Sequence, residues 1–383
     1  MIPLQNLKRF LGKALPQPFY ALSVGLRRLE AYYTYHFAGG RSSYPEAITF
    51  FLTRLCNLRC KMCGQWGDSG ASKNQESDIL KERLSLSEIK KILDEAVSFK
   101  PNITLFGGEP LMHPEALEII RSIKAKGLHC LIITNGLMLY NLAEDIVNTG
   151  LDELNISIDG PRELHDQIRG VSGAFDKIIA GVDAINDFKR RLLKNKPLIN
   201  IQCTINQHNY ERLEEILETV KQREANSLTF HNLIFLNKDA IEKQKALDGL
   251  LNCSSRDWEG FVFEPGIDSK KLYQKLKGIL SQKYPFAVDY FPNLSERGIT
   301  SYYADNYAPQ DYGSRCVSPW ACAYIFPDGE VKPCLNSSYS FGNIKNNKFL
   351  EIWNSDKAIV FRKTLKENKI FPACIRCTEL YRY

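Results

Sequence analysis

Two hydrophobic patterns alternate along the chain between residues 47 and 235. Short, mostly apolar runs are typical of buried strands, and apolar residues that recur three and four positions apart predict amphipathic helices. The expected strands are 47–53, 102–106, 129–134, 154–158, 198–204 and 228–235. The expected helices are 85–97, 114–126, 141–148, 174–188 and 209–223.

Signals at the ends of these segments agree with the pattern. Ser85 and Glu88 have the spacing of a capping box, Pro114 opens a helix, and Gly127 follows its end. Strands that alternate with helices predict an α/β fold with a parallel sheet and right-handed crossovers. Six such units are fewer than the eight of a closed TIM barrel. We therefore expect a partial (β/α)6 TIM-like barrel, with its chemistry at the carboxyl ends of the strands.

The flanking regions divide the chain into four expected parts. Residues 1–46 form an N-terminal helical segment, 47–235 the partial barrel, 236–310 a connector, and 311–383 a small C-terminal α+β domain. The connector is rich in aromatic residues, which either wall a substrate cavity or pack at the surface. In the C-terminal part, two short strands are expected around a Pro-Asp-Gly turn, with a helix after them.

Apolar residues recur at helical spacing near the N-terminus, with basic residues between them. The apolar residues are Leu4, Leu7, Phe10, Leu11 and Leu15, and the basic residues are Lys8, Arg9 and Lys13. A basic amphipathic helix can make peripheral contact with an anionic membrane. The alternative is a helix that packs against the rest of the protein, and both interpretations are open at this point.

Composition narrows the class of protein. The 383 residues are 44% hydrophobic and 25% charged, which is typical of a globular protein, and the net charge is +6. The densest basic cluster, at 189–196, ends an expected helix, where cations are favoured, so nucleic-acid binding is not expected. No segment resembles an export signal, which favours a cytoplasmic protein. In that reducing compartment, clustered thiols hold metals more often than they form disulfides.

Three cysteines follow the first expected strand with the spacing C-x3-C-x2-C. Cys56, Cys60 and Cys63 therefore lie on a loop at the carboxyl end of that strand. Thiolates bind zinc or iron–sulfur clusters, and structural zinc usually takes four ligands. Three ligands would leave one iron of a [4Fe–4S] cluster open, as a catalytic site requires. The spacing alone leaves open both a cluster and a zinc or structural role.

Further motifs at strand ends make the chain resemble the radical S-adenosylmethionine enzymes. They are FGGEP at 106–110, ISIDG at 156–160 and HDQIRG at 165–170. The resemblance covers nearly all of 47–235. It implies that the three cysteines hold a [4Fe–4S] cluster whose open iron binds S-adenosylmethionine.

The resemblance also assigns residues that bind S-adenosylmethionine. They are Met62, Gly107, Gly108, Glu109, Ser157, Asp159 and Arg169. The Gly-Gly-Glu motif would meet the methionyl amino group, the ISIDG segment the ribose and carboxylate, and the arginine of HDQIRG the carboxylate. Met62 replaces the aromatic residue that commonly packs near the adenine. The plain alternatives are an ordinary turn for the glycines and Asp159, a solvated acid for Glu109, a strand end for Ser157, and a surface cation for Arg169.

The C-terminal cysteines resemble a family extension called twitch, a shortened SPASM domain. The four that fit its pattern are Cys316, Cys334, Cys374 and Cys377. The resemblance implies a second [4Fe–4S] cluster with every position filled by cysteine, which favours electron transfer; a zinc site is the alternative. Cys322 is left out because the pattern does not require it. Cys130 and Cys203 are interpreted as small buried hydrophobes, and Cys253 has no assigned partner.

The activity implied by the resemblance is reductive cleavage of S-adenosylmethionine to a 5′-deoxyadenosyl radical, which takes hydrogen from a substrate. An external donor such as flavodoxin or ferredoxin would supply electrons. We expect a small or lipid-linked substrate, such as a sugar, and a net oxidation or rearrangement, because 46 residues before the barrel are too few for a peptide-recognition domain. The alternative is a maturase of a ribosomally made peptide, which would form a cross-link or thioether or epimerise a residue. The remote alternative is a non-catalytic metal-binding interaction protein.

Overall fold

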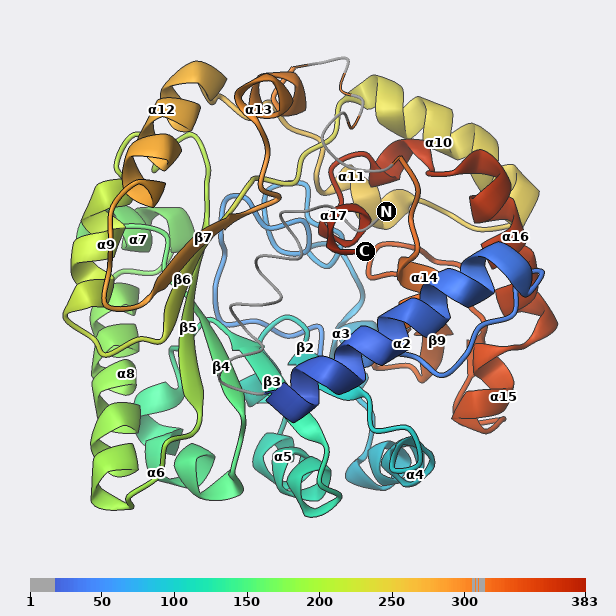
Figure 1. The fold of residues 1–383 in the computed structure, drawn as a ribbon, viewed down its shortest axis with the longest axis horizontal. Helices are drawn as coiled ribbons and strands as arrows, with labels where there is room; N and C mark the ends of the chain where they lie inside the picture. The colour runs from blue at the N-terminus through green and yellow to red at the C-terminus, as the bar shows by residue number, and fades with distance from the viewer. Residues whose placement is uncertain (1–17, 305–306, 308, 310–313) are drawn as a thin grey trace.

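One sheet organises the computed structural model, which describes residues 18–304, 307, 309 and 314–383 (Figure 1). Among these residues, ten strands follow the order β10-β9-β8-β1-β2-β3-β4-β5-β6-β7. Strands β1 to β6 are Ala47–Phe51, Asn102–Phe106, His129–Thr134, Glu153–Ser157, Leu198–Thr204 and Ser227–His231. Neighbours among them are parallel, so the predicted α/β class is confirmed.

Helices connect these strands and cover the outer face of the sheet (Figure 1). The crossover helices are α4 (Leu86–Ala96), α5 (Ala116–Ala125), α6 (Leu139–Thr149), α8 (Ala174–Arg191) and α9 (Leu213–Lys221). Ser85 and Glu88 form the predicted capping box at the start of α4. Two short helices, α3 (Ser77–Lys81) and α7 (Arg162–Arg169), follow the loops after β1 and β4 and were not predicted.

The expected connector contains a strand that the hydrophobic pattern did not reveal. Strand β7 (Ala287–Phe291) pairs in parallel with β6 and extends the sheet beyond the six predicted strands. Ala287 is exposed and Asp289 interrupts the apolar run, which explains why the pattern was weak. The helices in this region are α10 (Lys238–Leu251), α11 (Arg256–Glu259), α12 (Ser269–Leu280) and α13 (Glu296–Tyr302).

Residues of the C-terminal part join the same sheet. Strand β8 (Cys322–Ile325) pairs in parallel with β1, and β9 (Glu330–Lys332) and β10 (Gly342–Asn343) continue it in antiparallel fashion. The predicted hairpin is thus present between β8 and β9. The remaining elements are α14 (Ser318–Ala321), α15 (Phe349–Trp353), α16 (Asp356–Asn368), α17 (Thr378–Arg382) and the short 3-10 helices η1 (Pro110–Met112) and η2 (Pro372–Cys374).

Helix α2 (Pro18–Phe37) lies near the amino ends of β1 and β2. Arg28 forms an ion pair with Glu46 at 2.8 Å just before β1, and Tyr44 stacks on Phe99 just before β2. Helix α2 is the part of the predicted helical segment that the structure describes, and the repeat from Leu4 to Leu15 lies outside the described residues. No helix among those described is long and apolar enough to cross a membrane.

Candidate functional site

The loop that carries Cys56, Cys60 and Cys63 follows β1 and is held against the end of β2. The amides of Gly108 and Glu109 donate to the carbonyls of Thr53 and Leu55, both at 2.8 Å. A Cβ atom on Gly108 would lie 2.2 Å from the Leu55 carbonyl oxygen, and one on Gly107 would lie 2.6 Å from that of Thr53. Both glycines are therefore required where two protein backbones meet, whatever ligand also approaches them.

The C-terminal end of α7 holds the other side of the cysteine loop. The amides of Arg59 and Lys61 donate to the carbonyls of Arg169 and Ile168, at 3.2 and 3.1 Å. Gly170 ends α7 with a φ of 74°, and a Cβ atom there would lie 2.7 Å from the Arg59 carbonyl oxygen. The HDQIRG motif thus fixes the course of the loop on both sides of Cys60.

Arg169 links one of these cysteines to a buried carboxylate. Its guanidinium forms an ion pair with Asp159 at 2.6 Å and donates to the Cys60 Sγ at 3.6 Å. The Thr204 amide donates to Asp159 at 2.8 Å. Burial alone would lower the pKa of Arg169, but its contacts with Asp159 and Cys60 raise that pKa above its ordinary value. Arg169 is buried and charged, so the alternative of a surface cation is wrong.

Hydrogen-bond donors point at the sulfur atoms of the loop. The Leu58 amide donates to the Cys56 Sγ at 3.5 Å, and the Trp66 amide donates to the Cys63 Sγ at 3.4 Å. The Asn135 side chain lies 3.9 Å from the Cys56 Sγ as a further donor. Such donors stabilise a thiolate, the form of cysteine that binds metal.

Glu109 is buried where β2 and β3 end. Its carboxylate accepts hydrogen bonds from the Leu111 amide at 3.0 Å, the Thr134 hydroxyl at 2.8 Å and the Asn135 amide at 2.7 Å. Burial raises the pKa of Glu109 above its ordinary value, although these donors lower it. The carboxylate therefore holds the end of β3 beside the cysteine loop. Met62, on that loop, is half-buried against the core.

Polar side chains form one row that runs from the carboxyl half of β4 and β5 to the middle of β6 and β7. Ser157, Gln202, Thr229 and Asp289 are successive partners in the sheet register, so they share a face. The Gln202 side chain contacts His231, at the end of β6, at 2.5 Å. Of this row, the sequence motifs indicated Ser157 alone.

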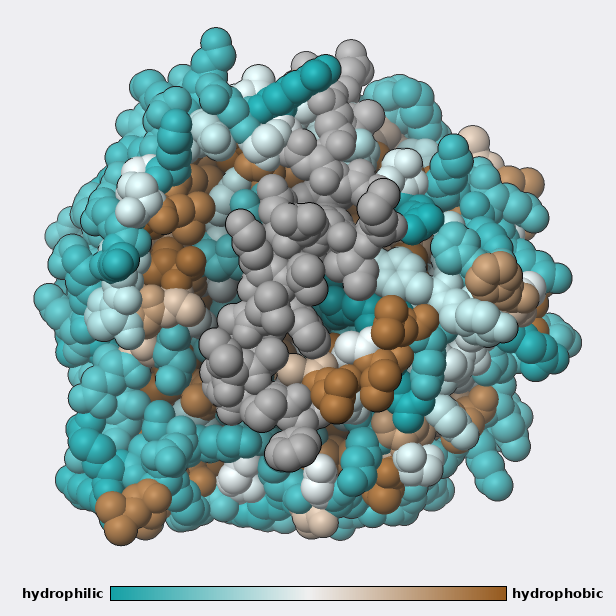
Figure 2. Space-filling model, in the orientation of Figure 1, coloured by the Kyte–Doolittle hydropathy of each residue, from teal (hydrophilic) through white to brown (hydrophobic). Residues whose placement is uncertain are grey.

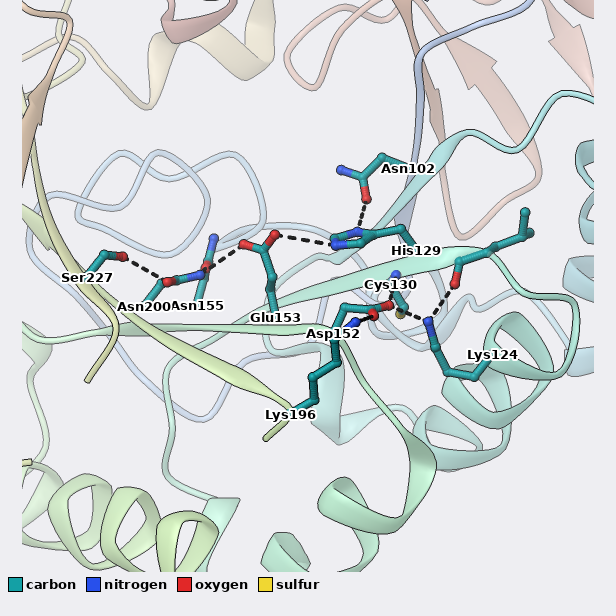
Figure 3. A network of polar contacts seen from close by, with 11 residues as sticks. Asn102, Lys124, His129, Cys130, Asp152, Glu153, Asn155, Lys196, Asn200 and Ser227 are labelled. Atoms are coloured by element: carbon teal, nitrogen blue, oxygen red, sulfur yellow. Dashed lines mark hydrogen bonds and ion pairs between the residues drawn. The ribbon is translucent and has the colours of Figure 1, made fainter. Parts of the chain in front are cut away.

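A second polar group crosses the sheet at the opposite, amino end of the strands (Figure 3). Its members are Asn102, His129, Glu153, Asn155, Asn200 and Ser227. Asn200 donates to Glu153 and to Asn155, both at 3.0 Å, and Ser227 donates to Asn200 at 2.8 Å. The sequence motifs did not indicate this network, although the alternation of polar and apolar residues in 153–157 and 198–204 was a signal for it.

Five cysteines line one cavity at the C-terminal end of the chain. They are Cys253, Cys316, Cys334, Cys374 and Cys377, so the four predicted ligands are brought together. Cys322 lies elsewhere, on β8, with its Sγ 2.7 Å from the Tyr383 hydroxyl. Cys253, which follows α10, could not be assigned a partner from the sequence. Burial, aided by Asp248 and Cys334, raises the pKa of its thiol to about 11.

The chemistry of both cysteine sets fits iron–sulfur clusters. None of these cysteines forms a disulfide. Burial raises the pKa of Cys56 to about 11 and that of Cys374 to about 12, so the thiols stay neutral unless a cation binds. The Nε of Arg169 is buried and has no hydrogen-bond partner among the described residues, which suits an anionic ligand beside Cys60. No described group of His, Cys, Asp or Glu is arranged to hold a single metal ion, so this fit concerns donor type and not coordination geometry.

Family models match both regions that carry the cysteines. Residues 50–220 match the radical SAM superfamily, and residues 316–378 match the iron–sulfur cluster-binding domain called SPASM. An AdoMet-dependent heme synthase of Methanosarcina barkeri is 28% identical, over 87% of this chain and 88% of its own length. A Fe-coproporphyrin III synthase of the same organism is 29% identical, over 86% and 80%. The tungsten-containing aldehyde ferredoxin oxidoreductase cofactor-modifying protein of Pyrococcus furiosus is 24% identical, over 85% of each chain.

Solved structures share the fold. Streptococcus suis SuiB bound to S-adenosylmethionine has a TM-score of 0.60 and 14% identity, over 85% of this chain and 69% of that one. The protein anSMEcpe with bound AdoMet has a TM-score of 0.55 and 18% identity, over 88% and 94%. At these identities the likeness shows the fold alone.

Proposed function

Because this chain contains a radical SAM domain and a C-terminal SPASM domain, we propose that it is a radical SAM enzyme that oxidises or rearranges a small or lipid-linked substrate. When bound and reduced by one electron, a [4Fe–4S] cluster with S-adenosylmethionine supplies a 5′-deoxyadenosyl radical that takes a hydrogen atom from a substrate carbon. The protein holds and orients these groups and excludes water. The cysteine loop at the carboxyl end of β1, fixed from both sides, is the observation that carries the proposal.

The residues around the loop have distinct parts in this proposal. Cys56, Cys60 and Cys63 would hold the cluster, and donors already directed at their sulfur atoms support that role. Arg169 would balance the negative charge of the Cys60 thiolate. Its Nε, which has no partner among the described residues, would donate a hydrogen bond to the carboxylate of bound S-adenosylmethionine. Asp159 would keep the guanidinium in place through their ion pair.

The C-terminal cavity would hold the second cluster. Cys316, Cys334, Cys374 and Cys377 line it together, and four cysteines would fill the coordination of a [4Fe–4S] cluster. A filled coordination shell leaves no position for substrate, which supports a role in electron transfer. An external electron donor such as flavodoxin or ferredoxin completes the proposed system.

The substrate side is supported by the relatives and by the polar row on β4 to β7. The two Methanosarcina barkeri relatives are named for heme and Fe-coproporphyrin III, and the Pyrococcus furiosus relative for a cofactor, all of which are small molecules. Gln202, His231 and Asp289 would bind polar groups of a small substrate near the carboxyl ends of the strands. SuiB has also been solved with a precursor peptide, so a peptide substrate is the competing outcome of the deuterium experiment below.

Metal content tests the assignment of the two sites. After anaerobic reconstitution, the full chain should hold about eight irons and cleave S-adenosylmethionine to 5′-deoxyadenosine. The double variant Cys374→Ala/Cys377→Ala should lose about half of the iron and retain unproductive cleavage, and Cys322→Ala is the matched control that should lose neither. Zinc without iron would contradict the proposal, as would loss of cleavage in the double variant while the fold survives.

Deuterium transfer tests the substrate class. The reconstituted enzyme should incorporate deuterium into 5′-deoxyadenosine when it is given small molecules or lipids extracted from cells grown on deuterated medium. Incorporation from the peptide fraction alone would overturn the small-substrate proposal in favour of a peptide maturase. The iron content of the reconstituted protein is independent of this outcome.

A further inference from the structure

Helix α2 carries a continuous apolar stripe that faces solvent. The exposed fractions of its side chains are 63% for Leu22, 54% for Leu26, 59% for Leu29, 65% for Tyr33 and 74% for Phe37. Spacings of four, three, four and four residues place them on one face of the helix. The opposite face packs on the protein through Ala21, Ala31 and Tyr35, which are buried.

The stripe differs from the scattered apolar residues elsewhere on the surface. Tyr140, Leu193 and Leu250 are also exposed, but each lies on a different segment. Single exposed hydrophobics are normal in proteins, whereas a contiguous apolar patch marks an interaction site. Figure 2 shows hydrophobic side chains along the part of the front face where Figure 1 places α2.

Positive charge is concentrated in the same part of the chain. Residues 1–46 contain six Lys or Arg and two Asp or Glu, so they contribute +4 of the net charge of +6. Lys366, from α16, donates to the His36 carbonyl at 3.0 Å, near the C-terminal end of the stripe. Arg41 is exposed just beyond the helix. Two cations, Arg41 and Lys366, therefore lie at the end of α2 that carries Phe37.

We infer that α2 is an interfacial helix that binds an anionic lipid membrane. An exposed apolar stripe with cations at one end matches the boundary between acyl chains and anionic headgroups. Tyr33 and Phe37 would enter that boundary, and Arg41 and Lys366 would face the lipid phosphates. A protein partner would need no such excess of positive charge, which is why the membrane is the favoured occupant.

The position of α2 leaves the cysteine loop free in such a complex. Arg28 pairs with Glu46, and Arg27 donates to the Phe99 carbonyl at 3.4 Å, so the helix sits near the amino ends of β1 and β2. The cysteine loop follows the opposite, carboxyl end of β1. A protein bound through α2 would therefore keep that loop away from the lipid headgroups, where a soluble electron donor can reach it. Membrane binding through α2 does not depend on the proposed enzymatic function.

Vesicle binding by the full chain tests this inference. The wild type should co-sediment with phosphatidylcholine vesicles that contain about 30% phosphatidylglycerol, and much less with phosphatidylcholine alone. Raising the salt from about 0.1 M to about 0.5 M should weaken binding because it screens the charges. The triple variant Leu22→Gln/Leu29→Gln/Tyr33→Gln should reduce the bound fraction by about tenfold. The matched control Tyr140→Gln/Leu193→Gln/Leu250→Gln, which alters residues elsewhere that are at least as exposed on average, should bind as the wild type does.

Two outcomes would overturn the inference. One is a wild type that does not bind the anionic vesicles, or a triple variant that binds them as well as the wild type. The other is a dimer in sedimentation velocity that the triple variant converts to a monomer, which would assign the stripe to a second copy of the chain. Circular dichroism of both triple variants shows whether each is folded, so that loss of binding is not confused with loss of structure.

Discussion

Replacing Gly108 by alanine should detach the cysteine loop from the end of β2. The new Cβ atom would lie 2.2 Å from the Leu55 carbonyl oxygen and 2.7 Å from that of Arg54. Both neighbours are backbone atoms, so no side-chain rotation relieves the overlap and the loop itself must move. The movement would break the two hydrogen bonds from the amides of Gly108 and Glu109, each 2.8 Å long.

The loss of folding stability in Gly108→Ala can be worked out from those two hydrogen bonds. Each backbone hydrogen bond contributes about 0.5–1.5 kcal/mol net, and each buried group left unpaired costs about 1–3 kcal/mol. Two buried amides left unpaired at that cost should lower the free energy of unfolding of Gly108→Ala by about 2–6 kcal/mol, as measured by urea unfolding. Iron content after anaerobic reconstitution should fall in the same variant, because the displaced loop carries all three cysteines of the first site.

Gly278 provides a matched control. It lies within α12, and a Cβ atom there would meet no atom within 4 Å. Gly278→Ala should raise the free energy of unfolding by about 0.4–1 kcal/mol and leave the iron content unchanged. If Gly108→Ala unfolds at the same urea concentration as the wild type and binds full iron, the close approach of the two loops does not require glycine and the reasoning fails.

Two further predictions concern buried ionisable groups that contact Asp159. Asp159→Asn should lower the free energy of unfolding by about 3–5 kcal/mol, because it leaves the Arg169 guanidinium buried without its partner. Adding Arg169→Met should restore part of that loss, and an additive double variant would show that the pair does not interact. Burial, with a smaller contribution from Arg169, lowers the pKa of His165 to about 3. An unfolded histidine takes up a proton below about pH 6.5, so this group should reduce stability by about 2 kcal/mol between neutral pH and about pH 5. Urea unfolding of His165→Gln should lack that share of the acid sensitivity, and an unchanged pH profile would contradict it.

Local hydrophobic patterns were sufficient to predict β1 to β6 and their crossover helices. Strands β1, β2 and β6 are short apolar runs that are buried almost throughout, and β3 to β5 and the helices bury one repeating face. The same patterns put Cys56 at the carboxyl end of β1, where the folded chain has it. Strand β7 was missed since Ala287 is exposed and Asp289 is polar, so five residues carry no clear period. The pairing of β8 with β1 was also missed, because a contact between distant segments has no local pattern.

From the sequence, the chemistry of the candidate site could be predicted from residue types, but the contacts that support the site could not. The resemblance predicted that Gly107 and Gly108 meet a ligand, which stays a prediction. The structure shows a further contact, the close approach of both glycines to the backbone of Thr53 and Leu55. Cys253 could not be placed from sequence, because its approach to the C-terminal cavity depends on how α10 packs. Such contacts depend on the three-dimensional path of the chain and not on the spacing of residues along it.

The parallel pairing of β8 with β1 has a consequence for how the chain is made. All five residues of β1 are buried in the folded protein, and one of its edges is covered only by β8. During synthesis, this edge of β1 stays unpaired until β8, which begins at Cys322, has left the ribosome. An unpaired apolar edge is a template for aggregation. Premature termination before residue 322 should therefore yield a product that aggregates, and chaperones that shield exposed strands should be needed most before the last part of the chain is complete.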